Sequence, residues 1–513
     1  MRPALARGIV PAVTRWAWVI DQTKCIGCHA CTTACKSENH VPLGVFRTWV
    51  KNVDVGVFPE VRRHFAVLRC NHCEDAPCVE ICPVTAMYQR DDGLVDFDES
   101  LCIGCKACMQ ACPYDAIYMD PDSNTAAKCN FCSHRVDEGL LPACVVVCPV
   151  EALVFGDMDD ATSKVARTLI ERKVTVRRAE QRTRPKAFYV GAHEATLDPL
   201  AAVHTGMYAW ADGRADGNGD RRSRTPSVRP PVVAYDVPRQ RTWGWKVAAY
   251  IWTKSIATGA ALVPAVLRLS GHDTSGSLLS RVAPALALAF LALTGVLLVA
   301  DLKRPERFWT ILIRPQWRSW LARGAFVITV YGAFLVAWAW ASWYGRDHWL
   351  DILAWPVVLL SLLTAVYTAF LFAQCEGRDL WQSRLLGLHL MLHAPIAGFA
   401  ALIGVAAMFR APVSLMPLSP WIALALVVSA ALMLIDGFGR HATPNGVAAA
   451  RALTRGPQAG MFWLSLVAGA LLPAALLVLS PGLWGLAATP LVLAGLFEYG
   501  RALVLAGQGP PIS

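Results

Sequence analysis

Sixteen of the 17 cysteines in this chain fall in four tight groups within the first third of its 513 residues. The groups are Cys25, Cys28, Cys31 and Cys35; Cys70, Cys73, Cys78 and Cys82; Cys102, Cys105, Cys108 and Cys112; and Cys129, Cys132, Cys144 and Cys148. Thiolates two or three residues apart bind separate corners of an iron–sulfur cubane, and a last cysteine followed by proline is typical of a ligand for a second cluster. Proline follows the last cysteine of the second, third and fourth groups, whereas Lys36 follows that of the first. The spacing therefore predicts [4Fe-4S] chemistry.

Sixteen thiolates match the requirement of four [4Fe-4S] clusters and leave none over. Two other uses of cysteine fit the pattern less well. A disulfide framework is typical of short secreted chains, and we expect no signal peptide in this long one. A structural zinc site uses paired CxxC motifs, whereas a CxxCxxCxxxC run crowds four sulfurs more tightly than a tetrahedral zinc site does.

The groups and their order resemble the four-cluster electron-transfer subunits of molybdopterin oxidoreductases, such as those of dimethyl sulfoxide reductase and polysulfide reductase, over residues 15–195. The resemblance implies that the groups interleave. In one pair, Cys148 joins Cys25, Cys28 and Cys31, and Cys35 joins Cys129, Cys132 and Cys144; in the other, Cys112 joins Cys70, Cys73 and Cys78, and Cys82 joins Cys102, Cys105 and Cys108. Some relatives have tryptophan at the position of Cys105 and hold a three-iron cluster, so the cysteine here implies four cubanes.

The same resemblance implies that the second and third groups lie nearer the membrane, and the first and fourth nearer a catalytic subunit. Five basic residues adjoin the groups: Lys24, Lys36, Lys106, Lys128 and Arg135. A positive charge there offsets the negative charge of thiolate-ligated iron and raises the cluster's reduction potential. Ordinary solvated surface charge is the alternative explanation for these side chains.

The composition changes along the chain and divides it into three parts. Apolar residues make up 55% of the whole, and their excess lies after residue 243. We expect an iron–sulfur domain at 1–195, an Arg-, Pro- and Gly-rich linker at 196–242, and a membrane domain at 243–513. The predicted fold class is an α+β ferredoxin-like domain followed by an all-α polytopic membrane domain. The net charge of +10 lies mainly in the linker and in loops beside the bilayer, so no nucleic-acid partner is expected.

Eight apolar stretches follow the linker, each long enough to cross the roughly 30 Å hydrocarbon layer, which takes about 20 residues. They run near 246–267, 279–300, 320–343, 350–373, 386–408, 420–438, 460–480 and 483–505. The last two could instead form one re-entrant pair. The passages 243–262, 301–326 and 364–390 resemble the NrfD family of polysulfide reductase-type membrane anchors. The chain therefore looks like a fusion of two subunits that are usually separate.

Ionisable side chains in apolar spans are costly and therefore mark candidate functional sites. A quinone needs a donor or proton relay at each carbonyl and an apolar slot for its tail. By resemblance to polysulfide reductase, Tyr367 would line a quinone pocket and Lys254 would contribute from the first span. Asp301 and His389 complete the predicted quinone site. Lys254 could instead pair with Asp301 or extend to the interface, and Tyr367 could simply bond a neighbouring helix.

Other polar residues in the spans have competing explanations. His389 and His393 lie one turn apart on one predicted helix, whereas a b-type haem usually takes ligands from two helices, so no haem is expected. Asp436 and Glu498 could line a proton path or form helix–helix contacts. Cys375 lies outside the four groups and is expected only to pack.

The distribution of basic residues predicts the side of the membrane that the clusters face. Fifteen lysines and arginines flank spans or lie in loops on the side of the iron–sulfur domain, against Arg268, Arg281, Arg346 and Arg410 on the other. Because cytoplasmic loops are enriched in Lys and Arg, we expect a multi-pass protein of the bacterial inner membrane with its iron–sulfur domain in the cytoplasm. The first residues contain neither a long apolar segment nor a twin arginine, which agrees with this orientation.

These features predict a non-catalytic electron-transfer and membrane-anchor subunit of a respiratory complex. Electrons would pass between a diffusible quinone in the lipid bilayer and a separate catalytic subunit through four clusters. The resemblance implies a molybdopterin-type partner, since no pterin-binding domain is recognisable in this chain. The alternatives are a redox-driven proton-translocating module of a larger respiratory complex, or an electron-transfer subunit that serves a hydrogenase or a flavoprotein.

Overall fold

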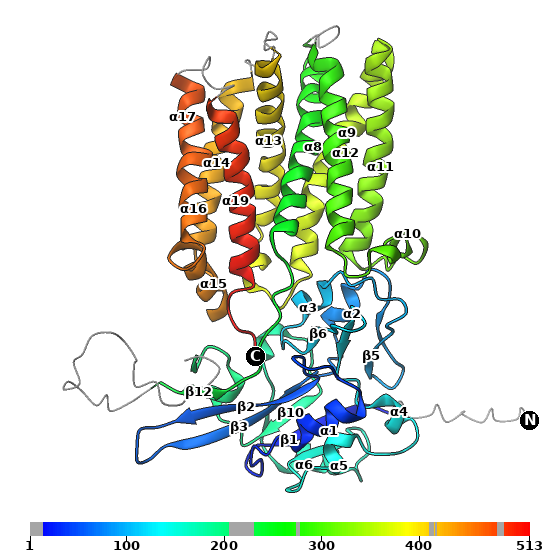
Figure 1. Ribbon diagram of the computed structural model, residues 1–513, viewed down its shortest axis with the longest axis vertical. Helices are drawn as coiled ribbons and strands as arrows, with labels where there is room; N and C mark the ends of the chain where they lie inside the picture. The colour runs from blue at the N-terminus through cyan, green and yellow to red at the C-terminus, as the bar shows by residue number, and fades with distance from the viewer. Residues whose placement is uncertain (1–13, 205–229, 273–277, 410–414, 416–417, 480–486) are drawn as a thin grey trace, which may run out of the picture.

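The computed structural model describes residues 14–204, 230–272, 278–409, 415, 418–479 and 487–513. A domain of short helices and small sheets carries the cysteine groups and packs against one end of a bundle of long helices (Figure 1). This order confirms the predicted fold class. The contact between the two parts determines where the cysteines lie relative to the membrane helices.

Two four-stranded sheets organise the first domain. One has the order β8 (Leu153–Asp157), β1 (Trp16–Asp21), β10 (Ala187–Val190) and β9 (Val174–Thr175); the other has the order β11 (Val203–His204), β12 (Val232–Tyr235), β2 (Thr48–Val55) and β3 (Arg62–Arg69). Trp18 in the first sheet and Trp49 in the second are fully buried and join one apolar core. Strand β3 ends immediately before Cys70, so the second sheet positions the second cysteine group.

Short elements surround the cysteine groups. Two small hairpins pair β4 (Met87–Gln89) with β5 (Val95–Phe97), and β6 (Ile117–Met119) with β7 (Ala126–Lys128). The helical elements are α1 (Ala30–Glu38), α2 (Pro77–Glu80), α3 (Ala107–Ala111), α4 (Ser133–Val136), α5 (Ala143–Val146), α6 (Lys164–Glu171), η1 (Ala179–Gln181) and α7 (Glu194–Leu197).

The segment 196–242, predicted as a linker, is partly folded. Strand β12 pairs antiparallel with β2 and parallel with β11, so both ends of the segment belong to the second sheet. The run Val232–Tyr235 is rich in β-branched and aromatic residues, which favour a strand, although Pro and Arg surround it. Residues 205–229 of the predicted linker lie outside the described residues. The linker prediction is therefore wrong for β11 and β12.

Within the described residues, eight helical segments are long and apolar enough to cross a membrane, as predicted. They are α8 (Trp245–Leu269), α9 (Leu278–Asp301), α11 (Trp320–Trp343), α12 (Asp347–Ala373), α13 (Leu386–Met408), α14 (Ser419–Phe438), a continuous segment of α16 (Ala459–Leu466), η5 (Val467–Leu471) and α17 (Leu472–Leu479), and α19 (Thr489–Gly507). The last two segments are separate crossings in length and composition. They do not form one re-entrant pair.

The long helices form two packed groups. Helices α8, α9, α11 and α12 contact one another, and α13, α14, α16, α17 and α19 form the second group. Helix α8 joins the groups because it also contacts α13 and α19. At the crossing with α13, Gly259 lies directly against Gly398, and a side chain at either position would collide with backbone.

Short elements connect the long helices at the end that faces the iron–sulfur domain (Figure 1). They are η2 (Pro305–Arg307), α10 (Thr310–Ile313), η3 (Asp379–Gln382) and α15 (Pro444–Thr454).

Candidate functional site

The same local structure shapes all four cysteine groups. The third cysteine is the second residue of a short helix in each group: Cys31 in α1, Cys78 in α2, Cys108 in α3 and Cys144 in α5. Within each CxxC pair, the residue before the second cysteine has a left-handed backbone: Gly27, His72, Gly104 and Phe131. Glycine adopts this conformation freely, which explains the CIGC sequence of the first and third groups.

The structure gathers the sixteen thiols into four sets, which we number from the membrane outward. Set 1 contains Cys82, Cys102, Cys105 and Cys108; set 2 contains Cys70, Cys73, Cys78 and Cys112; set 3 contains Cys35, Cys129, Cys132 and Cys144; and set 4 contains Cys25, Cys28, Cys31 and Cys148. The last cysteine of each group therefore lies with the first three of another group.

Thiols of one set shift one another's pKa, which shows that they lie close together. In set 3, burial and then the neighbouring Cys144 and Cys132 raise the pKa of Cys35 to about 12. In set 1, burial and then Cys82 raise the pKa of Cys105 to about 12. Since burial disfavours a free thiolate, these positions suit thiols that become charged only against a metal cation.

The four sets form a line. Burial raises the pKa of Cys108, Cys129 and Cys31, and in each case a thiol of an adjacent set raises it further. Cys78 of set 2 acts on Cys108 of set 1, Cys70 of set 2 acts on Cys129 of set 3, and Cys144 of set 3 acts on Cys31 of set 4. Set 1 therefore adjoins set 2, set 2 adjoins set 3, and set 3 adjoins set 4. At the outer end of this line, Cys28 is exposed.

Two kinds of metal site use four thiolates. In a tetrahedral zinc site, every sulfur lies about 2.3 Å from the same ion. In a cubane, each thiolate binds a different iron. Backbone N–H groups also donate to ligand sulfurs, for example Met87 to Cys82 at 3.4 Å and Ala152 to Cys148 at 3.3 Å. The sets therefore fit [4Fe-4S] clusters.

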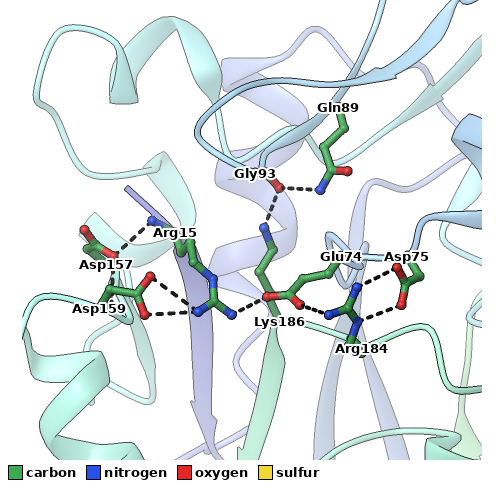
Figure 2. Close-up of polar contacts among 9 residues, drawn as sticks. All are labelled: Arg15, Glu74, Asp75, Gln89, Gly93, Asp157, Asp159, Arg184 and Lys186. Carbon is green, nitrogen blue, oxygen red and sulfur yellow. Dashed lines mark hydrogen bonds and ion pairs between the residues drawn. The ribbon is translucent and has the colours of Figure 1, made fainter. Parts of the chain in front are cut away.

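An ion-pair network holds the loop that follows Cys73 (Figure 2). Glu74 pairs with Arg15 and with Arg184, and Asp75 pairs with Arg184 at 2.6 Å. Partly exposed pairs contribute little singly. Together they join the second cysteine group to the chain just before β1 and just before β10.

A cavity of about 250 Å³ lies among α8, α9, α11 and α12 at the end of the bundle nearest set 1. Its lining is mostly apolar, and it includes Tyr367 from α12 and Asp301 at the end of α9. Cys105 and Trp243 also line it, and the Trp243 indole donates to the carbonyl of Cys105 at 3.3 Å. The cavity therefore touches both the membrane helices and the first set of thiols.

Lys254 lies behind the wall of this cavity. Its ammonium group donates to the carbonyl of Ala365 at 3.1 Å and to the hydroxyl of Thr368, and it stands 4.5 Å from the centre of the Tyr367 ring. Lys254 does not pair with Asp301, which was one alternative from the sequence. Asp301 instead pairs at 2.8 Å with Lys106, the residue after Cys105. A membrane helix and a cysteine loop are thereby joined by a mostly buried ion pair.

His389 is not brought together with Tyr367 and does not line this cavity. It lies in the second group of helices, 3.5 Å from the carboxylate of Asp436 in α14. Tyr499 of α19 donates to that carboxylate at 2.8 Å, and Ser429 lies 3.2 Å from His389 Nε2. The sequence could not separate the two polar sites because hydropathy does not show which spans pack together.

Several residues that join the two domains were missed from the sequence. Gln110 of α3 donates to Gln508 at 2.9 Å and accepts from Arg378 at 2.7 Å. Gln508 in turn donates to the carbonyl of Trp243 at 2.8 Å. Glutamines carry no chemical signature in a sequence, so only the fold shows that they cross this interface.

Four sets of clustered thiols joined to an apolar helical bundle define a multi-pass membrane protein with iron–sulfur centres for electron transfer. Models for a "4Fe-4S dicluster domain" match residues 17–83 and 61–158, and a model for "Polysulphide reductase, NrfD" matches residues 236–509. The chain belongs to the NrfD family, with the dicluster domains fused ahead of the membrane domain.

Curated relatives resemble the iron–sulfur part. A tetrathionate reductase subunit of Salmonella typhimurium is 44% identical over 190 residues, covering 36% of this chain and 76% of its own length. A polysulfide reductase polypeptide of Wolinella succinogenes is 41% identical over 179 residues, covering 34% of this chain and 94% of its own length. Protein NrfC of Escherichia coli is 41% identical over 180 residues, covering 34% of this chain and 80% of its own length.

Proposed function

We propose that this chain passes electrons between a quinone bound in the cavity at Tyr367 and a separate catalytic subunit, through [4Fe-4S] clusters held by sets 1 to 4. The observation that carries this proposal is that Cys105 and Tyr367 line the same cavity. A ring bound there lies next to set 1, and the remaining sets continue the line to the exposed Cys28.

The cavity has the groups that quinone chemistry needs. A quinone takes up or releases two electrons together with two protons. The Tyr367 hydroxyl can donate a hydrogen bond to one ring oxygen, and the Asp301 carboxylate can exchange a proton with another polar atom of the ring. Lys254 supports Tyr367 from behind, and the apolar side chains of α9 and α11 suit an isoprenoid tail.

The outer end of the line supports a catalytic partner. Near the exposed Cys28, Ile26 is 56% exposed, and Val146 of α5, which packs against α1, is 59% exposed. Exposed apolar side chains in one region favour a protein interface. The relatives from tetrathionate reductase and polysulfide reductase are each named as one component of such an enzyme. We infer a molybdopterin-type catalytic subunit at this face.

We also propose that the iron–sulfur domain lies on the cytoplasmic side of a bacterial inner membrane. The loops rich in Lys and Arg contact that domain: Lys303 donates its backbone N–H to Gly104 at 3.2 Å, and Arg307 donates to the carbonyl of Glu99 at 2.8 Å. Positive loops favour the cytoplasm. A reporter fused at residue 150 should be active only in the cytoplasm, and activity outside the inner membrane would refute this orientation.

The test of quinone chemistry uses the purified full chain in lipid nanodiscs. Its clusters are reduced with dithionite and then mixed with a benzoquinone or a naphthoquinone analogue. We expect Tyr367→Phe to slow reoxidation at least tenfold while the clusters stay reducible. Tyr331→Phe is the control, because Tyr331 is a buried tyrosine that bonds Ala257 and lies outside the cavity lining. Equal rates for wild type and Tyr367→Phe would place the quinone elsewhere.

The polar cluster of His389, Asp436 and Tyr499 favours a second candidate function, redox-driven proton translocation. Its members are buried in the helices that do not form the cavity. Glu498, the other acidic candidate, lies 3.6 Å from Arg501 on the same helix. In proteoliposomes, translocation requires proton movement beyond the quinone stoichiometry, and Asp436→Asn should abolish that excess alone. Proton movement equal to the quinone stoichiometry would exclude this function.

The class of partner is tested by copurification. Molybdenum in the isolated complex would support the molybdopterin partner. Nickel or flavin in its place would instead support the hydrogenase or flavoprotein alternative.

A further inference from the structure

Arg69 occupies an unusual position between two sets of thiols. It is the last residue of β3, it is fully buried, and its guanidinium lies 4.2 Å from the centre of the Trp18 ring. Its Nη1 donates to the sulfur of Cys144 in set 3 at 3.2 Å. A guanidinium stays protonated in proteins, so this buried group carries a positive charge.

The other nitrogens of this guanidinium have no protein partner. Both Nε and Nη2 of Arg69 are buried without an acceptor, and among the described residues no carboxylate pairs with Arg69. A buried, unpaired charge with unused donors is strongly unfavourable in an apolar interior. Such a residue is retained where an anionic acceptor occupies the space beside it. A cubane with four thiolate ligands supplies negative charge and sulfur acceptors at this place.

Arg69 lies close enough to act electrostatically on thiols of both set 3 and set 4. Its charge acts on Cys129 and Cys144 of set 3 and on Cys31 of set 4. The inner thiols have different basic neighbours: Lys128 acts on Cys78 of set 2, and Lys106 acts on Cys105 of set 1. Unlike Lys106, which pairs with Asp301, Arg69 has no counter-ion in the described chain.

We propose that Arg69 is a positioning residue that raises the reduction potentials of the clusters in sets 3 and 4, by placing one positive charge and its free N–H donors between them. Each cluster takes up one electron without forming or breaking a bond, so the reduced state carries one more negative charge. A fixed guanidinium stabilises that state more than the oxidised one. This inference rests on the proposed function, because it requires clusters in both sets.

The test is a redox titration of the purified full chain, followed by electron paramagnetic resonance, with iron measured on the same samples. Arg69→Gln removes the charge and most donors. We expect the ratio of reduced to oxidised cluster in sets 3 and 4 to fall at least tenfold at a fixed potential, a shift of about 59 mV for one electron. The clusters of sets 1 and 2 should change much less. Arg63→Gln is the matched control, because Arg63 lies on the same strand but is exposed and pairs with Asp54.

A second variant decides the case in which Arg69→Gln fails to retain iron. Arg69→Lys keeps the charge but loses the Nε and second Nη donors, so we expect a smaller fall in the same two potentials with iron retained. Unchanged potentials in an iron-replete Arg69→Gln or, if that variant loses iron, in Arg69→Lys would overturn the inference. Wild-type protein with far fewer than about sixteen irons would instead refute the four-cluster function on which it rests.

Discussion

A bulky side chain at Gly295 should close the proposed quinone cavity without disturbing the fold. Gly295 lies within α9 and lines the cavity, and a Cβ added there meets no atom within 4 Å. Phenylalanine also has a better helix propensity than glycine, by a few tenths of a kcal/mol. The Gly295→Phe variant should therefore fold and retain its iron while its ring occupies the space of the ligand.

The magnitude follows from the surface that the ligand would lose. A quinone ring that buries about as much apolar area as an aromatic side chain, roughly 150 Å², gains about 4 kcal/mol at about 25 cal/mol per Å². Loss of half of this contact already weakens binding about thirtyfold, since about 1.4 kcal/mol is tenfold. We expect reoxidation of the reduced clusters by a quinone analogue to slow at least thirtyfold at subsaturating concentration.

Two controls separate occupation of the cavity from other effects of the substitution. Gly295→Ala adds only a methyl group and should leave the rate within about twofold. Gly460→Phe places the same ring on α16, where an added Cβ also meets nothing within 4 Å, far from the cavity lining. An iron-replete Gly295→Phe variant that reacts with quinone at the wild-type rate would refute the assignment of this cavity.

Three further predictions concern stability and metal content. Burial lowers the pKa of Lys51 to about 8 from 10.5; the unfolded chain then binds more protons between these values, so wild-type stability should rise with pH across that window. Lys51→Met should remove this rise in thermal unfolding and stabilise the protein at pH 7 by about 3 kcal/mol at most, and an unchanged pH dependence would contradict the reasoning. Asp301→Asn leaves the mostly buried Lys106 unpaired and should cost about 3 kcal/mol, largely recovered by adding Lys106→Met; no recovery would show that the pair is not the cause. Cys35→Ser should lower iron by up to about four per chain, whereas Cys375→Ser should leave it unchanged, and equal losses would contradict the assignment of set 3.

The features most readable from the sequence are those encoded by local spacing. The long apolar runs predict all eight membrane segments, because each crossing must satisfy its own backbone within one helix. Contacts between distant residues were harder to anticipate. Lys106 and Asp301 are 195 positions apart, and nothing local indicates that they pair. The strand at Val232–Tyr235 does not stand out in the sequence because its four residues lie among Pro and Arg.

Arg69 is absent from the basic residues predicted beside the cysteine groups, although its position in the sequence would have placed it among them. It directly precedes Cys70 and so stands beside a cysteine group, as Lys24 and Lys128 do, but its guanidinium donates to Cys144 of set 3. What the sequence lacks is the burial of Arg69 and its distance from Cys144, which lies 75 positions later. A basic residue at the end of a strand is usually solvated, and only the fold distinguishes it from Arg62 or Arg63 at the exposed end of the same strand.

The pairing of β12 with β2 limits how far the iron–sulfur domain can move relative to the membrane domain. Only residues 236–244 separate this strand from α8, and Gln240 exchanges hydrogen bonds of 2.8 and 3.0 Å with the backbone of Met119 along the way. A long flexible tether would make an electron-carrying domain search for its docking position before every transfer. Here the connection is short, and its hydrogen bonds to Met119 hold it against the iron–sulfur domain. If electrons pass between the cavity and set 1 as proposed, this short connection spares the domain a docking search, and the rate of that transfer should not vary with solvent viscosity.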